Sequence, residues 1–451
     1  MRRNPNLRRL SKRLSSGKKS CEEVIIECMV MADTEDGLFT WLDPNVIEQA
    51  KKIDLARESG DLPPLAGIPI TLKDLFNVNG QKTTAGSKVL DAIGSEATED
   101  AEVVAHLRDA GMLFLGRTNM SEFAFSGMGL NPHFPPLYSV WDRKTGRLPG
   151  GSSSGSAVSV ALGIVPGTVG SDTAGSCRIP AAFNGIVGVK PSYGRLSLEG
   201  VYPLSPTSDA PGPLGEDVDT CFILDHVMTG KLGGELPKMS PENTMNMRLM
   251  VPDGIVMEDL DMEVNMAFRR AMKRLKAGGV DVVTGTLSAV DHSIDMFFNR
   301  PVVLFEAWQH HVKMLELHGD LYDPFVRQRI GGGKTVTAET QHQRYEEKAE
   351  LVKFFNHDFA EAEIDALVYP TVACIPPAVS ETDDPERIGA INLRCLRNTA
   401  SVNYYDGCAI TLPCHEQGMP PVGLMICCPH GQDEKLYNLA AKVESILRED
   451  E

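Results

Sequence analysis

A large α/β fold is the architecture that this 451-residue sequence predicts. Strand-like segments with alternating side chains are followed by helix-like segments with one apolar face, and this order recurs along the chain. Apolar residues make up 42% and charged residues 23%, so the chain can bury a sizeable core. No Pro/Gly-rich linker divides it, and we therefore expect a single domain over residues 1–451.

The clearest strand signal is AGIPITLKDLF, residues 66–76. Ile70 and Leu72 point to one side of the expected strand, whereas Thr71 and Lys73 point to the other. The apolar side would pack into a core. Lys73 would then lie on the opposite side of a buried strand, where desolvation could change its ionisation.

Helical segments follow and connect further strands. Residues 99–110 begin with acidic residues and carry valines and a leucine on one face, and residues 112–119 return as a strand. A strand–helix–strand order normally joins parallel neighbours, so we expect a mostly parallel sheet. Further helices are expected at residues 256–280, 300–318 and 338–365.

The charge and the cysteines exclude several classes of protein. A net charge of −17 opposes general affinity for nucleic acid or for anionic lipid, because both require a positive field. The ten cysteines show no metal-binding spacing, and no apolar run reaches the ~18 residues of a membrane span. With no secretory signal at the start, we expect a cytoplasmic protein with reduced thiols.

The first 19 residues are basic and contain no acidic residue. Such a segment is compatible with an organellar transit peptide. Leu7, Leu10 and Leu14 follow a helical spacing, however, with basic residues around them. We therefore favour a first helix that packs against the fold.

Two Gly/Ser-rich clusters lie within PGGSSSGSAVSVALGIVPGTVGSDTAGSCRIPA, residues 149–181. Residues 156–162 suit a short helix and residues 167–171 a strand, and Pro180 fits the first turn of another helix. Both clusters thus fall at the ends of regular elements. Backbone N–H groups are exposed at such ends and can bind anions.

The second cluster suggests a serine chemistry that needs no histidine. A serine hydroxyl becomes a good nucleophile when a base removes its proton, and a desolvated lysine such as Lys73 can be that base. The small residues Thr173, Ala174 and Gly175 would let a loop turn tightly and aim N–H groups at an oxyanion, with Ser176 at the apex. Binding of an anion or a phosphate by the same N–H groups is the alternative.

Other motifs are incomplete. GGGKT at residues 331–335 resembles a phosphate loop, but Gln328 occupies the position of its first glycine. His311 and His318 lie two helical turns apart, too far to ligate one metal ion, so no metal is expected. GSSSG at residues 151–155 has the form of a nucleophile elbow, but no apolar strand precedes it.

Taken together, the ordered motifs resemble those of the amidase signature family. The motifs are LAGIPITLKDLF, GGSSSGSA and GSDTAGSCRIPAAFNGIVGVKPSYGR. The resemblance is close over residues 64–227 and from residue 364 to residue 451, and loose over residues 230–358. It implies a large mixed, mostly parallel β-sheet with helices on both sides.

The resemblance also implies a catalytic triad of Lys73 as base, Ser152 as bridging serine and Ser176 as nucleophile. The peptide bond Gly151–Ser152 would be cis. Backbone N–H groups of four residues would form the oxyanion hole: Thr173, Ala174, Gly175 and Ser176. Ala174 departs from the family pattern, which has glycine there.

The implied activity is hydrolysis of a linear amide through an acyl-serine intermediate, without a cofactor. We expect a small polar amide or ureide as substrate. The expected substrate-binding residues are Phe123, Ala124, Phe125, Ser126, Tyr138 and Arg178. Three alternatives remain: the amidase subunit of a glutamyl-tRNA amidotransferase, a hydrolase resembling allophanate hydrolases, and a catalytically idle scaffold. A homodimer is one assembly that the sequence allows.

Overall fold

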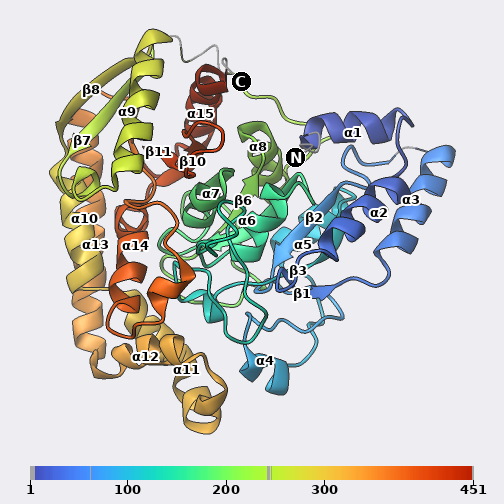
Figure 1. Cartoon of the computed structure of the whole chain (residues 1–451), viewed down its shortest axis with the longest axis horizontal. Helices are drawn as coiled ribbons and strands as arrows, with labels where there is room; N and C mark the ends of the chain where they lie inside the picture. Colours follow the sequence, from blue (N-terminus) through green and yellow to red (C-terminus); the bar gives the residue numbers. More distant parts are fainter. Residues whose placement is uncertain (1–5, 61, 241–243, 245, 449–451) are drawn as a thin grey trace.

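One mixed sheet of eleven strands organises the computed structural model, which describes residues 6–60, 62–240, 244 and 246–448 (Figure 1). In sheet order the strands are β1 (Phe39–Leu42), β3 (Leu113–Thr118), β2 (Pro69–Lys73), β4 (Gly167–Asp172), β6 (Ala210–Gly215), β5 (Val187–Lys190), β10 (Cys408–Pro413), β11 (Gly423–Cys428), β9 (Ala366–Pro370), β7 (Arg248–Asp253) and β8 (Asp281–Thr286). The strands of the closely and the loosely matching segments thus share a single sheet.

The expectation of a mostly parallel sheet is wrong. Parallel pairing is confined to two places, β3–β2–β4 and β9–β7–β8. The strands between β4 and β9, and the pair β1–β3, are antiparallel. Two strands account for four of these six antiparallel pairs: β6 runs opposite to β4 and β5, and β10 runs opposite to β5 and β11.

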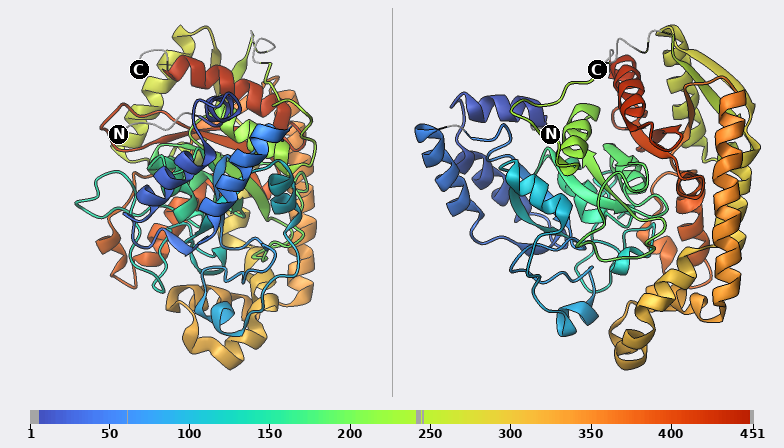
Figure 2. Two further views of the ribbon diagram at one scale, coloured as in Figure 1. Left: turned by 90° about the vertical axis from the view of Figure 1, so that its right-hand side faces the viewer. Right: turned by 180° about the vertical axis from the view of Figure 1, so that it is seen from behind.

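Fifteen α-helices surround the sheet in the described part of the chain. They are α1 (Leu7–Ser15), α2 (Cys21–Ala32), α3 (Val46–Ser59), α4 (Lys88–Ile93), α5 (Glu102–Asp109), α6 (Ser154–Ala161), α7 (Arg178–Asn184), α8 (Val218–Met228), α9 (Met262–Ala277), α10 (Ser288–Asn299), α11 (Val303–His318), α12 (Pro324–Gly331), α13 (Ala338–Glu361), α14 (Ile388–Tyr404) and α15 (Asp433–Arg448). Figures 1 and 2 show α1–α3 at one end of the sheet and α9, α10 and α13 at the other.

Both faces of the sheet are covered by helices, as expected. On β11, Met425 and Cys427 belong to a buried cluster with residues of α7, α10, α13 and α14. Leu424 and Ile426 belong to a second cluster with residues of α8, α9 and α15. Alternate residues of one strand therefore enter different cores, as the pleat of a β-strand requires.

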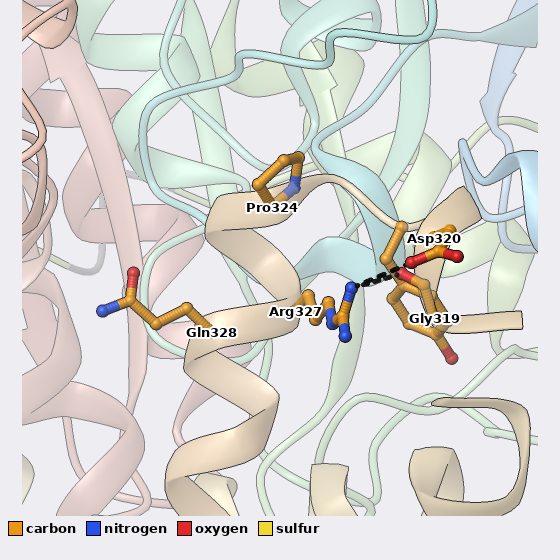
Figure 3. A pocket seen from close by; sticks show the side chains of 6 residues that line it. Gly319, Asp320, Pro324, Arg327 and Gln328 are labelled. Carbon is orange, nitrogen blue, oxygen red and sulfur yellow. Dashed lines mark hydrogen bonds and ion pairs between the residues drawn. The ribbon is translucent and has the colours of Figure 1, made fainter. Parts of the chain in front are cut away.

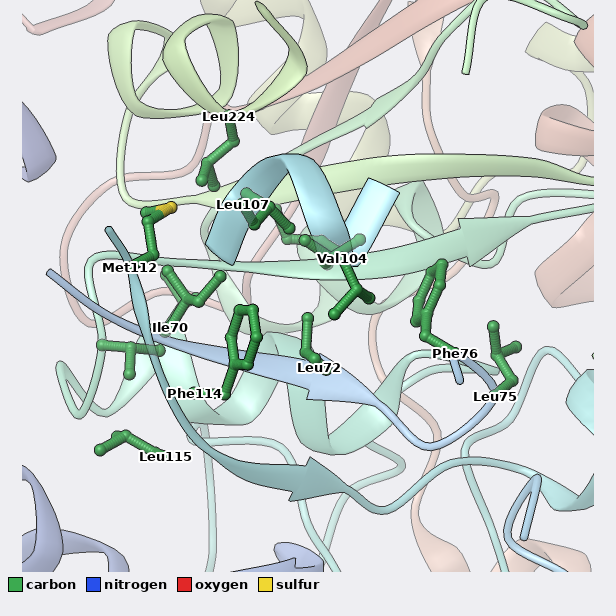
Figure 4. Close-up of a cluster of buried hydrophobic side chains, with 14 of the residues drawn as sticks. Ile70, Leu72, Leu75, Phe76, Val104, Leu107, Met112, Phe114, Leu115 and Leu224 are labelled. Carbon is green, nitrogen blue, oxygen red and sulfur yellow. The ribbon is translucent and has the colours of Figure 1, made fainter. Parts of the chain in front are cut away.

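The predicted alternation in β2 is confirmed. Ile70 and Leu72 are buried with Val104 and Leu107 of α5 and Phe114 of β3 (Figure 4). Complete burial of a leucine or phenylalanine side chain contributes about 1.5–3 kcal/mol, so this face fixes the position of β2. The strand in turn fixes the position of Lys73, its last residue.

The N-terminal helix is part of the fold. Leu7, Leu10 and Leu14 are buried in the core, as their spacing predicts. Arg8 pairs with Asp219 of α8 through an Nη2–Oδ1 contact of 2.7 Å. None of the described helices is both long and apolar enough to cross a membrane.

Candidate active site

The centre of the site is Lys73, at the carboxyl end of β2. Its side chain is completely buried. The ammonium nitrogen Nζ lies 2.6 Å from Ser152 Oγ and 2.8 Å from Ser171 Oγ. Burial lowers the pKa of Lys73 to about 8, because the charged form loses its hydration. A substantial fraction of this lysine is therefore neutral near physiological pH.

Ser152 belongs to the first Gly/Ser cluster, directly before α6. The peptide bond Gly151–Ser152 is cis, and the Ser152 side chain is fully buried. The next residue connects the two clusters, because the Ser153 N–H donates to the Ser176 carbonyl oxygen at 3.2 Å. The structure thus brings Lys73, Ser152 and the backbone of Ser176 into one buried region.

The loop that carries Ser176 is held by the carboxylate of Asp172, the last residue of β4. Asp172 accepts hydrogen bonds from the N–H groups of Gly175 at 2.8 Å and Cys177 at 3.1 Å. Arg178 pairs with the same carboxylate at 2.9 Å. Burial alone would raise the pKa of Asp172, but the charge and hydrogen bonds of Arg178 outweigh it and lower the pKa to about 2.

These contacts change the expected set of oxyanion donors. The N–H of Gly175 is already bonded to Asp172. The N–H groups of Thr173, Ala174 and Ser176 have no hydrogen-bond partner among the described residues. Three of the four expected donors are therefore free for a ligand, and the fourth shapes the loop.

Gly175 is the position in this loop that needs glycine. Its φ is +128°, and an added Cβ would lie 2.1 Å from Thr399 Oγ1 of α14. Thr399 Oγ1 donates to the Ala174 carbonyl oxygen at 2.7 Å, so α14 supports the loop from behind. Ala174 itself has a negative φ, which its methyl group tolerates.

A narrow cavity with ≈ 30 Å³ of free volume adjoins Ser176, and we call it the Ser176 cavity. Apolar groups form most of its wall, and Arg329 is the one charged side chain among the described residues that line it. The lining residues are Ala124, Phe125, Ser126, Gly127, Thr173, Ala174, Ser176, Leu204, Ser208, Phe297, Val302, Val303, Arg329, Leu396 and Tyr404. The cavity thus gives Ser176 a mostly apolar surrounding with one positive charge in its wall.

The expected substrate-binding residues divide into two groups. Ala124, Phe125 and Ser126 line the Ser176 cavity, whereas Phe123, Tyr138 and Arg178 do not. The backbone of Phe123 is left-handed, with φ of 52°, and the ring packs against Tyr202, His311 and Tyr322.

Tyr138 and Arg178 lie away from the cavity for different reasons. The Tyr138 ring lies against Gly146 in a half-buried loop. Arg178 is fully buried behind the Ser176 loop, where Asp172, Thr399 and Asn403 saturate its guanidinium. The expectation of substrate contact is therefore dropped for both residues and for Phe123.

Sequence reasoning missed three residues that shape the site. Ser171 is the second partner of Lys73. Asp172 orders the oxyanion loop, and its position at the end of a strand beside the serine cluster was a usable signal. Arg329 lines the Ser176 cavity from α12, in the segment where the family resemblance is loose.

A second, open hollow lies on the exposed side of α12 (Figure 3). Its volume is ≈ 350 Å³, and its wall includes Tyr322, Pro324 and Gln328. Its charged residues Arg327 and Asp320 lie 3.5 Å apart and face each other. Because it contains no residue of the Lys73–Ser152–Ser176 set, it is separate from the candidate active site.

The sequence matches the Amidase family over residues 23–437. It is 31% identical to 2-amino-5-chloromuconic acid deaminase of Comamonas testosteroni over 90% of this chain and 88% of that protein. It is 30% identical to a component of the glutamyl-tRNA(Gln) amidotransferase of Cupriavidus metallidurans over 96% of this chain and 95% of that component.

Comparison of the folds also relates this chain to amidases. The structure superimposes on the crystal structure of an amidase with a TM-score of 0.85 and 30% sequence identity, covering 98% of this chain and 99% of that one. The match includes the loose segment as well as the family motifs. The chain therefore belongs to the amidase family and is an enzyme that acts on carbon–nitrogen bonds other than peptide bonds.

Proposed function

We propose that the protein hydrolyses a small amide through an acyl-serine intermediate on Ser176, with Ser152 and Lys73 as its proton relay. The observation that carries this proposal is the buried contact of 2.6 Å between Lys73 Nζ and Ser152 Oγ. A fully buried lysine with a pKa of about 8 is a competent base, whereas an exposed lysine is almost entirely protonated at neutral pH.

In the acylation step, neutral Lys73 accepts the proton of Ser152, and Ser152 accepts the proton of Ser176. The Ser176 oxygen attacks the amide carbonyl carbon and forms a tetrahedral oxyanion. The free N–H groups of Thr173, Ala174 and Ser176 donate to that oxyanion. Loss of one such donor typically costs ~10²–10³ in rate.

The same relay then completes the reaction. The proton held by Lys73 returns through Ser152 to the amide nitrogen, so that ammonia or an amine leaves as a neutral molecule. Water attacks the acyl-serine ester, with Lys73 and Ser152 again accepting the proton. The products are a carboxylic acid and regenerated Ser176, and no cofactor takes part.

The relatives support two variants of this chemistry. A deaminase relative favours release of ammonia from a small polar substrate. The amidotransferase component, similar over 96% of this chain, favours a second candidate in which this chain is part of a ligase complex. Partner dependence separates them: the first enzyme is active alone, and the second needs companion proteins and uses glutamine.

The test is ammonia release by the purified chain from small amides, ureides, glutamine and aryl amides. Wild type is compared with Ser176→Ala and with Ser197→Ala, a substitution outside the Ser176 cavity. The proposal is supported if Ser176→Ala abolishes ammonia release and Ser197→Ala preserves it. Release that survives in Ser176→Ala refutes the assigned nucleophile, and glutamine-dependent release only with added companion proteins supports the second candidate.

A further inference from the structure

Arg329 lines the Ser176 cavity as a partly exposed cation without an ion-pair partner among the described residues. Its Nε is buried and has no hydrogen-bond partner, and no ion pair joins its guanidinium to any described residue. Its guanidinium carbon lies 4.5 Å from the centroid of the Phe125 ring. This stacking orients the flat guanidinium but does not neutralise it.

The buried Arg117 and Arg178 and the partly exposed Arg195 are neutralised within the chain, whereas the partly exposed Arg329 has no carboxylate partner among the described residues. Arg117, Arg178 and Arg195 each pair with a carboxylate, at 2.8, 2.9 and 2.6 Å respectively. Buried charges are normally paired, because an isolated charge loses its hydration without compensation. Burial lowers the pKa of Arg329 to about 10, and the side chain remains protonated at neutral pH. No described carboxylate neutralises it, so the guanidinium is available to an anionic group of a ligand.

The surroundings of Arg329 favour an anion. No acidic side chain is among the described residues that line the cavity. The ammonium of Lys348 donates to Ser208 Oγ at 3.2 Å, which leaves the Ser208 hydroxyl hydrogen free to donate. The nearby Glu306 is occupied by three hydroxyl groups, those of Ser205, Thr207 and Tyr345.

We propose that Arg329, assisted by the Ser208 hydroxyl, binds a carboxylate on the acyl part of the substrate. Ser176 and Arg329 line one narrow cavity, so an amide carbonyl at Ser176 directs a short acyl chain towards the guanidinium. The substrate class is then a monoamide of a short dicarboxylic acid. The apolar wall strengthens the ion pair by excluding water. This assignment rests on the proposed function for the orientation of the substrate.

The kinetic test compares matched substrates. Monoamides of dicarboxylic acids with three to five carbons are set against neutral primary amides of the same length, and kcat/KM is measured for wild type, Arg329→Gln and Arg329→Lys. A charge-assisted hydrogen bond typically changes binding by about 10- to 100-fold. We expect Arg329→Gln to lower kcat/KM by that factor for the charged amides, with the neutral amides changed less than about threefold. Arg329→Lys should restore part of the loss.

Arg327→Gln is the matched control. Arg327 lies on the same helix, two residues away, but its side chain is exposed and pairs with Asp320 in the separate hollow of Figure 3. This variant should behave as wild type towards every substrate. Equal losses for charged and neutral amides in Arg329→Gln, or no loss for either, would overturn the proposal, since the side chain would then have only a structural role.

A binding measurement separates this inference from the proposed function. Calorimetric titration of succinate and glutarate into Ser176→Ala, and into the double variant with Arg329→Gln, does not require turnover. If Arg329→Gln weakens the binding of succinate or glutarate at least tenfold, the carboxylate site is supported even if no amide is hydrolysed. Equal binding, or no binding, in the two proteins overturns it even if amides are hydrolysed.

Discussion

The ionisation of Lys73 makes the strongest quantitative prediction. With a pKa of about 8, about 9% of Lys73 is neutral at pH 7 and about 90% at pH 9. An exposed lysine, with a pKa of about 10.4, would be only about 0.04% neutral at pH 7. Burial therefore raises the reactive fraction at pH 7 by about 200-fold. If neutral Lys73 is the base, kcat/KM should rise about tenfold from pH 7 to pH 9 and level off above.

The assay is ammonia release at substrate concentrations well below KM, from pH 6 to pH 10, with a substrate that does not titrate in that range. Lys73→Arg is the control, because an arginine keeps its proton at far higher pH than a lysine in the same surroundings. We expect it to lose at least about 10³-fold in kcat/KM at every pH. A flat wild-type profile, or Lys73→Arg activity within tenfold of wild type, would refute the role of Lys73.

Three further predictions concern stability. Lys73→Met should be more stable than wild type at pH 7, because a depressed lysine pKa penalises the folded state at pH values below it. This gain should fall by about 3 kcal/mol as the pH rises from 7 to 10.5. Urea unfolding at pH 7 and at pH 10.5 measures it, and a gain that is the same at both contradicts the pKa. Arg178→Met should lower the free energy of unfolding by about 3–5 kcal/mol, since it leaves the buried Asp172 carboxylate unpaired. A change below 1 kcal/mol in urea unfolding would contradict the role of this ion pair. Gly175→Ala should lower both Tm and kcat, because the added Cβ would lie 2.1 Å from Thr399 Oγ1 and because the backbone φ is +128°. Unchanged activity, measured as ammonia release, would show that the loop relaxes without cost.

Local patterns predicted the part of the site that depends on one strand or one turn. Alternation in residues 66–76 separates Lys73 from the apolar side of β2, and this needs no knowledge of the partner strands. The helical spacing of Leu7, Leu10 and Leu14 likewise anticipates a buried face. These signals are strong because each residue's environment follows from the geometry of a single element.

The sheet could not be predicted in the same way. β6 has the sequence APGPLG, and two prolines and two glycines argue against a central strand. It nevertheless pairs with β4 on one side and β5 on the other, which reverses the expected parallel order. Only the tertiary fold provides the partners that keep this segment extended.

The unpaired charge of Arg329 is also a property of the whole fold. In the sequence, Arg329 is one of two arginines in a short helix. It becomes distinctive because α12 carries it to the cavity of Ser176, which lies more than 150 residues earlier in the chain, and because none of the described carboxylates pairs with it there. Local sequence contains no signal for the absence of a counter-charge.

The most direct test of the account is the location of the acyl group during turnover. The enzyme is quenched in acid while it hydrolyses its best substrate, and residues 148–178, a single tryptic peptide with both Ser152 and Ser176, are fragmented by mass spectrometry. The account predicts the acyl mass on Ser176 in wild type and no adduct in Ser176→Ala. An acyl group on Ser152 or on another residue, or ammonia release by Ser176→Ala within tenfold of wild type, would contradict it.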